Sequence, residues 1–318
     1  MPLTNALTAL LGVKHPILLA PMDVVAGARL AAAVSNAGGF GILGAGYGNR
    51  AWLEQETRKM ATLAPGVPFG VGFITWSLAK QAELLDIALA AKPRAVMLSF
   101  GDPQPFANPI HGAGALMICQ VQTDEGAQQA LDAGADVLIA QGTEAGGHGG
   151  SRGTMSLVPA IVDLAKGRVP VVAAGGIADA RGLAAAIALG AQGVLMGTRF
   201  YATQEADGPD ECKRRICAAS GGDTVRGLLF DITRKNVWPT GHTGRCLVND
   251  IVRRWSGREV ELMQNAGTVA AEYDAAKAAG NYDIAAVIAG EAVSLIHDIP
   301  KAGDVVARMV GQKSVIPA

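Results

Sequence analysis

The sequence has almost no net charge and few cysteines, and each shortage excludes a class of protein. With 27 lysines and arginines against 28 aspartates and glutamates, the net charge is −1, and no basic run stands out. Nucleic acids and anionic membranes are therefore not expected partners. The four cysteines, Cys119, Cys212, Cys217 and Cys246, show neither CxxC spacing nor a metal-ligand pattern. We expect reduced thiols, no metal site and a cytoplasmic location.

Long apolar runs and a secretion signal are also missing. No apolar stretch is long enough to span a bilayer, and the first residues lack the basic start and small-residue cleavage site of a signal peptide. A membrane is therefore not an expected partner, and a soluble protein is the default. No feature of the sequence indicates an oligomeric state.

Glycine and apolar residues are abundant instead. The chain has 318 residues, of which 41 are glycines and 50% are hydrophobic. The glycines are dispersed, as is typical of an α/β enzyme with many tight turns between strands and helices. A chain of this length can bury the core of one large domain, or of one domain with a smaller appendage.

Up to about residue 200, short apolar segments alternate with amphipathic ones. The apolar segments are rich in Val, Ile, Leu, Met and Phe on both faces, which is typical of parallel strands covered by helices. The expected strands are 17–22, 40–44, 69–74, 95–100, 116–121, 137–141, 169–174 and 193–197. Strands that recur every ~25 residues favour a (β/α)8 barrel, the TIM barrel, over an open doubly wound sheet.

The amphipathic segments carry recognisable helix ends. The segment 123–133 opens with Thr123, the segment 179–189 opens with Asp179, and a glycine follows each directly. The expected helices are 28–36, 50–63, 77–91, 123–133 and 179–189. The connection 101–115 is short and holds three prolines, so we expect it to lack a full helix.

The pattern changes after residue 200. Helices are expected at 204–219, 266–279 and 298–310, whereas 221–258 reads as irregular. We therefore predict a barrel made of residues 1–204 plus 291–318. Residues 205–290 are predicted to form a smaller helical subdomain on the substrate side, inserted before the last helix.

The stretch 141–150, Gln-Gly-Thr-Glu-Ala-Gly-Gly-His-Gly-Gly, follows the sixth expected strand and is the strongest candidate site. Its glycines let the backbone lie close to a ligand and leave few side chains competing for space around His148. A loop histidine can simply be solvated or act as a hydrogen-bonding brace. The glycine context favours a role in proton abstraction or in polarising a substrate oxygen.

Two further turns indicate a phosphate site. Gly175 and Gly176 follow the seventh expected strand, and Gly197 and Thr198 follow the eighth. In barrels of this kind, backbone N–H groups at these positions commonly hold a phosphate. Plain turns remain the alternative. Walker A and GxGxxG fingerprints, covalent triads and metal-ligand spacing are absent, so a bound organic cofactor is favoured.

At these residues the chain resembles the nitronate monooxygenase (2-nitropropane dioxygenase) family of FMN barrels. The segment Glu144-Ala-Gly-Gly-His148 is the specific part of the resemblance, whereas the other segments alone are shared by several flavin barrels. The resemblance rests on Ala20-Pro-Met-Asp23, Ala33-Val-Ser-Asn-Ala-Gly-Gly-Phe-Gly-Ile42, Gly142-Thr-Glu-Ala-Gly-Gly-His-Gly149, Val171-Val-Ala-Ala-Gly-Gly-Ile-Ala-Asp179, Leu189-Gly-Ala-Gln-Gly-Val-Leu-Met-Gly-Thr-Arg-Phe200 and, more weakly, Ala289-Gly-Glu-Ala292.

The resemblance implies an FMN-dependent oxidoreductase that oxidises alkyl nitronates, or nitroalkanes, with dioxygen. His148 would be the catalytic base. FMN would contact the turns and strand ends at Pro21, Met22, Asp23, Gln120, Gln141, Gly146, Gly175, Gly176, Gly197 and Thr198. Gln120 stands where relatives often have a basic residue, and the third strand, around Gly72, lacks a common asparagine.

Two alternatives stay open from the sequence. The same scaffold serves NAD(P)H-dependent flavin reductases, namely quinone reductases and enoyl-acyl-carrier-protein reductases. A flavin-free barrel that binds a phosphate-bearing ligand would also use glycine turns of this kind.

Overall fold

Eight parallel strands form a barrel, and the (β/α)8 prediction is confirmed. The computed structural model describes residues 4–311, in which one sheet has the order β1-β9-β8-β6-β5-β4-β3-β2. A parallel bridge between Leu18 and Phe40 joins the two ends of this sheet. The barrel strands are β1 (Ile17–Leu19), β2 (Gly41–Gly46), β3 (Phe69–Ile74), β4 (Ala95–Ser99), β5 (Leu116–Val121), β6 (Val137–Gln141), β8 (Val171–Ala174) and β9 (Gly193–Met196).

The strands are apolar on both faces because both faces are buried. Leu18, Ile42 and Ile118 belong to a cluster that fills the barrel, while their neighbours along each strand pack under the surrounding helices. Helix α1 (Ala6–Leu11) contributes Leu7 and Leu11 to the interior cluster. It therefore closes the end of the barrel opposite the carboxyl ends of the strands, where sites form in this fold.

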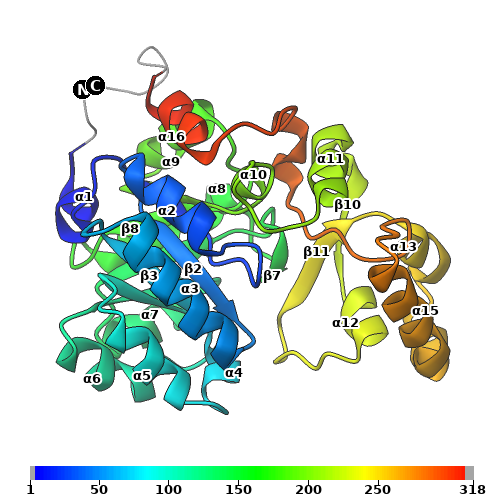
Figure 1. The fold of residues 1–318 in the computed structure, drawn as a ribbon. Coiled ribbons are helices and arrows are strands. Elements are labelled where there is room, and N and C mark those ends of the chain that lie inside the picture. The colour runs from blue at the N-terminus through cyan, green and yellow to red at the C-terminus, as the bar shows by residue number, and fades with distance from the viewer. Residues whose placement is uncertain (1–3, 312–318) are drawn as a thin grey trace.

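Helices surround the barrel (Figure 1), and those expected at 28–36, 50–63, 123–133 and 179–189 are among them. Thr123 and Asp179 cap α7 and α9 through their side chains, as predicted. The helices of the barrel are α2 (Ala28–Asn36), α3 (Arg50–Leu63), α4 (Thr75–Leu78), α5 (Glu83–Ala90), α6 (Gln104–Gly112), α7 (Asp124–Asp132), α8 (Thr154–Ala165), α9 (Ala180–Ala188), α10 (Thr198–Tyr201) and α16 (Ala302–Gly311).

The single helix expected at 77–91 is wrong, because the chain forms α4 and α5 with a break between them. Ser77, the expected helix cap, instead donates its hydroxyl to the carbonyl of Tyr47 at 2.7 Å, and Gln81 Nε2 donates to the same oxygen at 3.0 Å. These contacts tie the break to the loop that follows β2. A partner remote in sequence thus replaces the local cap.

The expectation that 101–115 lacks a full helix is also wrong. Helix α6 spans nine residues, with Pro103 at its N-cap and Pro105 in its first turn. Proline is tolerated there because the first N–H groups of a helix have no partner inside it. Only Pro109 lies deeper in the helix.

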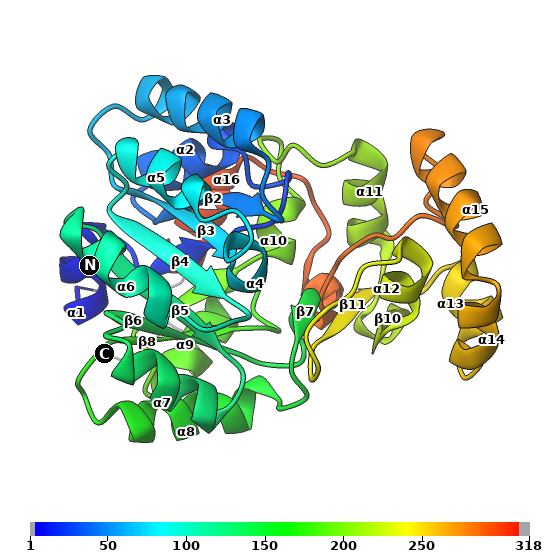
Figure 2. The ribbon, with the colours of Figure 1, turned by 90° about the horizontal axis from the view of Figure 1, so that it is seen from below.

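The stretch 221–258, predicted to be irregular, is ordered. Its strands β10 (Thr224–Gly227) and β11 (Thr243–Leu247) form a three-stranded antiparallel sheet with β7 (Gly147–Gly149) of the barrel loop. The sheet lies between the barrel and the helices of the 205–290 segment (Figures 1 and 2). The remaining elements are α11 (Asp210–Ala218), η1 (Gly221–Asp223), α12 (Leu229–Arg234), α13 (Asp250–Trp255), α14 (Glu259–Gln264), α15 (Ala266–Ala278) and η2 (Glu291–Leu295).

The division of the chain into a barrel and a 205–290 subdomain stays a prediction, and its residues 1–3 and 312–318 lie outside the described part. The helices expected at 204–219 and 298–310 begin later, at Asp210 and Ala302. Across residues 4–311, no helix combines the length and the apolar character needed to cross a membrane.

Candidate active site

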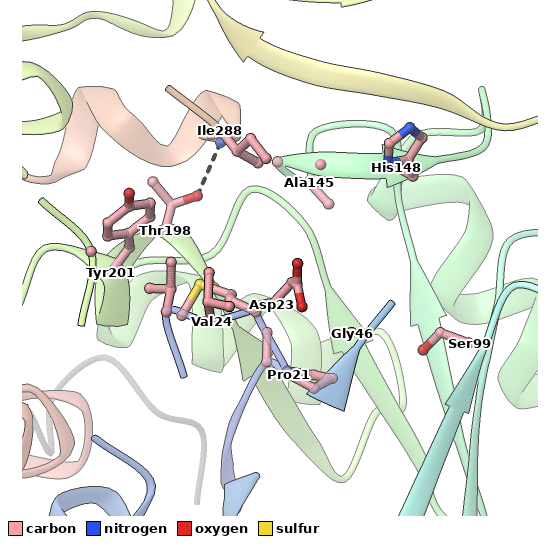
Figure 3. A pocket seen from close by; sticks show the side chains of 18 of the residues that line it. Pro21, Asp23, Val24, Gly46, Ser99, Ala145, His148, Thr198, Tyr201 and Ile288 are labelled. Carbon is pink, nitrogen blue, oxygen red and sulfur yellow. Dashed lines mark hydrogen bonds between the residues drawn. The ribbon is translucent and has the colours of Figure 1, made fainter. Parts of the chain in front are cut away.

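A cavity of about 520 Å³ opens at the carboxyl ends of the barrel strands, between the barrel and the 205–290 segment. In Figure 3, Pro21, Asp23, Gly46 and Ser99 face Ile288, Ala145 and His148 across it. Every candidate residue from the sequence lines this cavity: Pro21, Met22, Asp23, Gln120, Gln141, Gly146, His148, Gly175, Gly176, Gly197 and Thr198. The fold therefore brings them together, while their individual roles stay predictions.

The turns after β8 and β9 present free hydrogen-bond donors to this cavity. Among residues 4–311, the backbone N–H groups of Gly175, Gly176, Gly197 and Thr198 have no acceptor. Gly175 and Gly176 have φ of 102° and 73°, conformations that glycine adopts without strain. Convergent backbone N–H groups are a common way to bind phosphate oxygens, so these turns fit a phosphate group.

Thr198 also connects this end of the cavity to the segment around Gly290. Its Oγ1 accepts from the N–H of Gly290 at 3.0 Å (Figure 3, dashed line). A Cβ on Gly290 would lie 2.5 Å from Glu144 O, and one on Gly146 would lie 2.7 Å from Gly290 N. The segments around Gly146 and Gly290 are therefore in backbone contact, which explains why both need glycine.

His148 is held by partners that the sequence does not show. Its Nε2 lies 2.9 Å from Asp231 Oδ2, and both side chains are buried, with exposed fractions of 8% and 6%. A carboxylate only accepts, so Nε2 carries the proton. Nδ1 makes no hydrogen bond within residues 4–311 and is the nitrogen left to accept a proton.

Trp238 packs on the face of the His148 ring. The two rings are 3.4 Å apart at their centroids and nearly parallel, with an angle of 7°. Trp238 Nε1 and Asn236 Nδ2 donate to Tyr47 Oη at 3.0 and 2.8 Å, which ties the loop after α12 to the loop after β2. The sequence suggested that glycines leave His148 with few neighbours, but an aromatic ring and a carboxylate fix it.

Burial and nearby charges shift the pKa values of His148 and Asp23, two of the titratable residues at the cavity. Desolvation lowers the pKa of His148 below its ordinary value, and the hydrogen bond that His148 donates to the Asp231 carboxylate opposes this shift. His148 is therefore mostly neutral at neutral pH, the state in which it can accept a proton. The pKa of Asp23 is raised above its ordinary value because desolvation outweighs the opposing charges of Lys277 and Arg234 across the cavity.

Gln141 supports the backbone of His148 through a hydrogen bond. Its Nε2 donates to the carbonyl oxygen of His148 at 3.1 Å, and its Oε1 accepts from Gln122 Nε2 at 2.9 Å. Gln141 is nearly buried, at 7% exposed. Besides lining the cavity, it holds the backbone of the proposed base.

Sequence reasoning missed Asp231, Trp238 and Tyr47. Asp231 and Trp238 lie in the stretch that was predicted to be irregular, 83 and 90 residues from His148 in sequence. Trp238-Pro239 is an aromatic residue in a loop, which is a weak signal of a functional contact. No local pattern marks Asp231, which lies on α12 and reaches His148 only in the folded chain.

Known proteins with similar sequences and structures cover nearly the whole chain. A sequence model of the family described as nitronate monooxygenase matches residues 4–88 and 74–312. The nitronate monooxygenase of Pseudomonas aeruginosa is 31% identical, over 94% of this chain and 97% of its own. A (3aS,4S,5R,7aS)-5-hydroxy-7a-methyl-1-oxo-octahydro-1H-indene-4-carboxyl-CoA dehydrogenase of Rhodococcus jostii is 32% identical, over 97% of this chain and 95% of its own.

The structure of FabK from Thermotoga maritima superimposes with a TM-score of 0.86 at 32% identity, covering 98% of this chain and 96% of that one. The family match spans both the barrel and the 205–290 segment, so the His148–Asp231 contact lies wholly inside it. The resemblance noted in the sequence is thereby confirmed. The chain belongs to the nitronate monooxygenase family of flavin-dependent oxidoreductases.

Proposed function

We propose that this protein is an FMN-dependent nitronate monooxygenase that oxidises alkyl nitronates with dioxygen. The observation that carries the proposal is one cavity that joins unpaired N–H donors at Gly175, Gly176, Gly197 and Thr198 to a buried His148–Asp231 pair. The donors would hold the FMN phosphate. When bound, FMN supplies the electron transfer from the nitronate to dioxygen.

His148 is proposed as the catalytic base. Its Nδ1 would accept the proton next to the nitro group of a neutral nitroalkane, while Asp231 accepts from Nε2 and stabilises the imidazolium that forms. An existing nitronate needs no deprotonation, and His148 would then only orient the anion. Neutral nitroalkanes should therefore depend on His148 more strongly than nitronates do.

The test is a comparison of electron donors on the purified protein. The protein should be yellow or become yellow with added FMN. Under anaerobic conditions a nitronate should bleach the flavin, and oxygen should restore the colour. Rapid bleaching by NADH or NADPH with none by nitronates would favour the reductase alternative. A protein that takes up no flavin would support the flavin-free barrel, against which family membership already argues.

A second candidate substrate class is favoured by two basic side chains at the cavity. Arg234 and Lys277 of the 205–290 segment both line it, and the Rhodococcus relative is named for a carboxyl-CoA substrate. A CoA thioester carries phosphates that such cations attract. Anaerobic bleaching by an acyl-CoA, and not by a nitronate, would identify a flavin-dependent acyl-CoA dehydrogenase.

A cytoplasmic location remains part of the proposal. The four cysteines are free thiols. Free thiols agree with a compartment that keeps cysteine reduced.

A further inference from the structure

Arg226 of β10 stands apart from every other arginine of the chain in what its guanidinium contacts. It donates to five different main-chain carbonyl oxygens and to no carboxylate within residues 4–311. Nε and Nη2 reach Thr143 O at 3.1 and 3.0 Å, and Nη2 reaches Ala145 O at 2.7 Å. Nη1 reaches Gly147 O and Gly149 O at 3.3 and 3.4 Å, and also contacts Thr243 O.

Four of these carbonyls alternate along the segment 143–149, which carries Gly146 and His148. Two of the carbonyls between them have other partners. Glu144 O accepts from the N–H of Glu291 at 2.9 Å, and His148 O accepts from Gln141 Nε2. Residues 143–146 form a turn and 147–149 form β7, so Arg226 ties the turn to the strand that follows it.

The convergence of carbonyl oxygens calls for a cation. Each carbonyl carries partial negative charge, and removing a donor from such an acceptor in a half-buried site is costly. Arg226 shares Thr143 O with Arg245, whose Nε donates to it at 3.0 Å. Burial, together with the charge of Arg245, lowers the pKa of Arg226 to about 10, so the guanidinium is still protonated at neutral pH. Its planar fork spreads five N–H donors over three nitrogens, whereas a lysine ammonium has three donors on a single nitrogen.

We propose that Arg226 is a positioning residue, whose guanidinium holds the segment 143–149 in the conformation that places Gly146 and His148 at the cavity. Arg226 does not itself line the cavity, so it acts through that segment. The effect on catalysis rests on the proposed function of His148. The effect on the order of the segment does not.

The test uses chemical rescue of Arg226→Ala by guanidinium. We expect kcat/KM for a nitroalkane to fall about ten- to a hundredfold, as when charge-assisted hydrogen bonds are lost. Guanidinium chloride, at concentrations well below those that unfold the protein, should restore much of it, whereas sodium chloride at equal ionic strength should not. Arg226→Lys should stay impaired, because it keeps the charge without the fork of donors.

Arg253→Ala is the matched control. Arg253 lies on α13 and is exposed, and its ion pair is with Asp250 at 2.9 Å. This variant should keep wild-type activity and show no response to guanidinium. Wild-type kcat/KM in Arg226→Lys, or equal rescue by sodium chloride, would overturn the proposal.

Amide hydrogen exchange of residues 143–149 separates this proposal from the proposed function. Exchange there should rise at least about tenfold in Arg226→Ala and fall again with guanidinium. If the wild type oxidises no nitronate, the proposed function fails, and the exchange data alone decide the role of Arg226. If Arg226→Ala does not fold, exchange in Arg226→Lys decides, and wild-type protection there would refute the proposal.

Discussion

Replacing Asp231 with asparagine tests the link between tertiary structure and proton transfer. The substitution keeps the volume of the side chain and one acceptor oxygen, but it removes the charge that faces His148 and Arg234. Asp231 accepts from His148 Nε2 at 2.9 Å and from Arg234 Nη2 at 3.1 Å. Asp231 does not line the cavity, so the flavin site itself should be unchanged.

The size of the effect follows from burial. Both partners are more than nine-tenths buried, so little water screens the contact. A hydrogen bond to a charged group contributes about 1.5–3 kcal/mol, and its loss in the transition state lowers kcat/KM by about ten- to a hundredfold. The imidazolium that forms on proton transfer loses its counter-charge, so the loss should appear mainly in kcat for neutral nitroalkanes.

Oxygen consumption with a nitroalkane and with its nitronate, each over a range of pH, measures this prediction. The Asp231 carboxylate raises the pKa of His148 against the effect of burial. In Asp231→Asn the acid limb of the nitroalkane profile should therefore move to lower pH, with a smaller change for the nitronate. Flavin absorbance serves as the control for cofactor binding. An unchanged kcat/KM and an unchanged acid limb would refute the assignment of Asp231 to His148.

Three further predictions concern the same cavity. In the wild type, activity on neutral nitroalkanes should fall on the acid side with a midpoint below pH 6.5. Desolvation lowers the pKa of His148, and only the neutral ring accepts a proton. A midpoint above 6.5 would contradict this assignment. His148→Ala should keep its flavin spectrum but lose activity on neutral nitroalkanes, and full activity would remove the base assignment. Gly175→Ala should bind FMN at least about tenfold more weakly in a fluorescence titration. Alanine is strained at φ 102°, and its Cβ would lie 2.9 Å from Gly142 O. Unchanged affinity would argue against this turn as the phosphate site.

Local patterns were sufficient for the barrel. The eight apolar segments became strands, and the limits predicted at 69–74, 116–121 and 137–141 agree with β3, β5 and β6. Helices α7 and α9 begin after the predicted caps Thr123 and Asp179. Strand burial and helix capping are set within a few residues of the chain, so the sequence contains them directly.

Local patterns failed where a distant partner decided the conformation. Ser77 was expected to cap a helix, but Tyr47 O, thirty residues away, accepts its hydroxyl and the helix is split. The stretch 221–258 showed no strand signal, because β10 and β11 are short and are ordered by pairing with each other and with β7, and β10 is only partly buried. Short strands of this kind depend on their neighbours more than on their own residues.

Local sequence patterns are enough to predict the barrel, the glycine turns at its mouth and the position of His148 on the loop after β6. The contacts that orient His148 come from residues remote in sequence. Asp231 orients it, Trp238 covers one face of its ring and Arg226 fixes its backbone, and all three come from a segment about 80 to 90 residues further along the chain. These contacts arise from long-range pairing and desolvation, which no pattern of neighbouring residues contains.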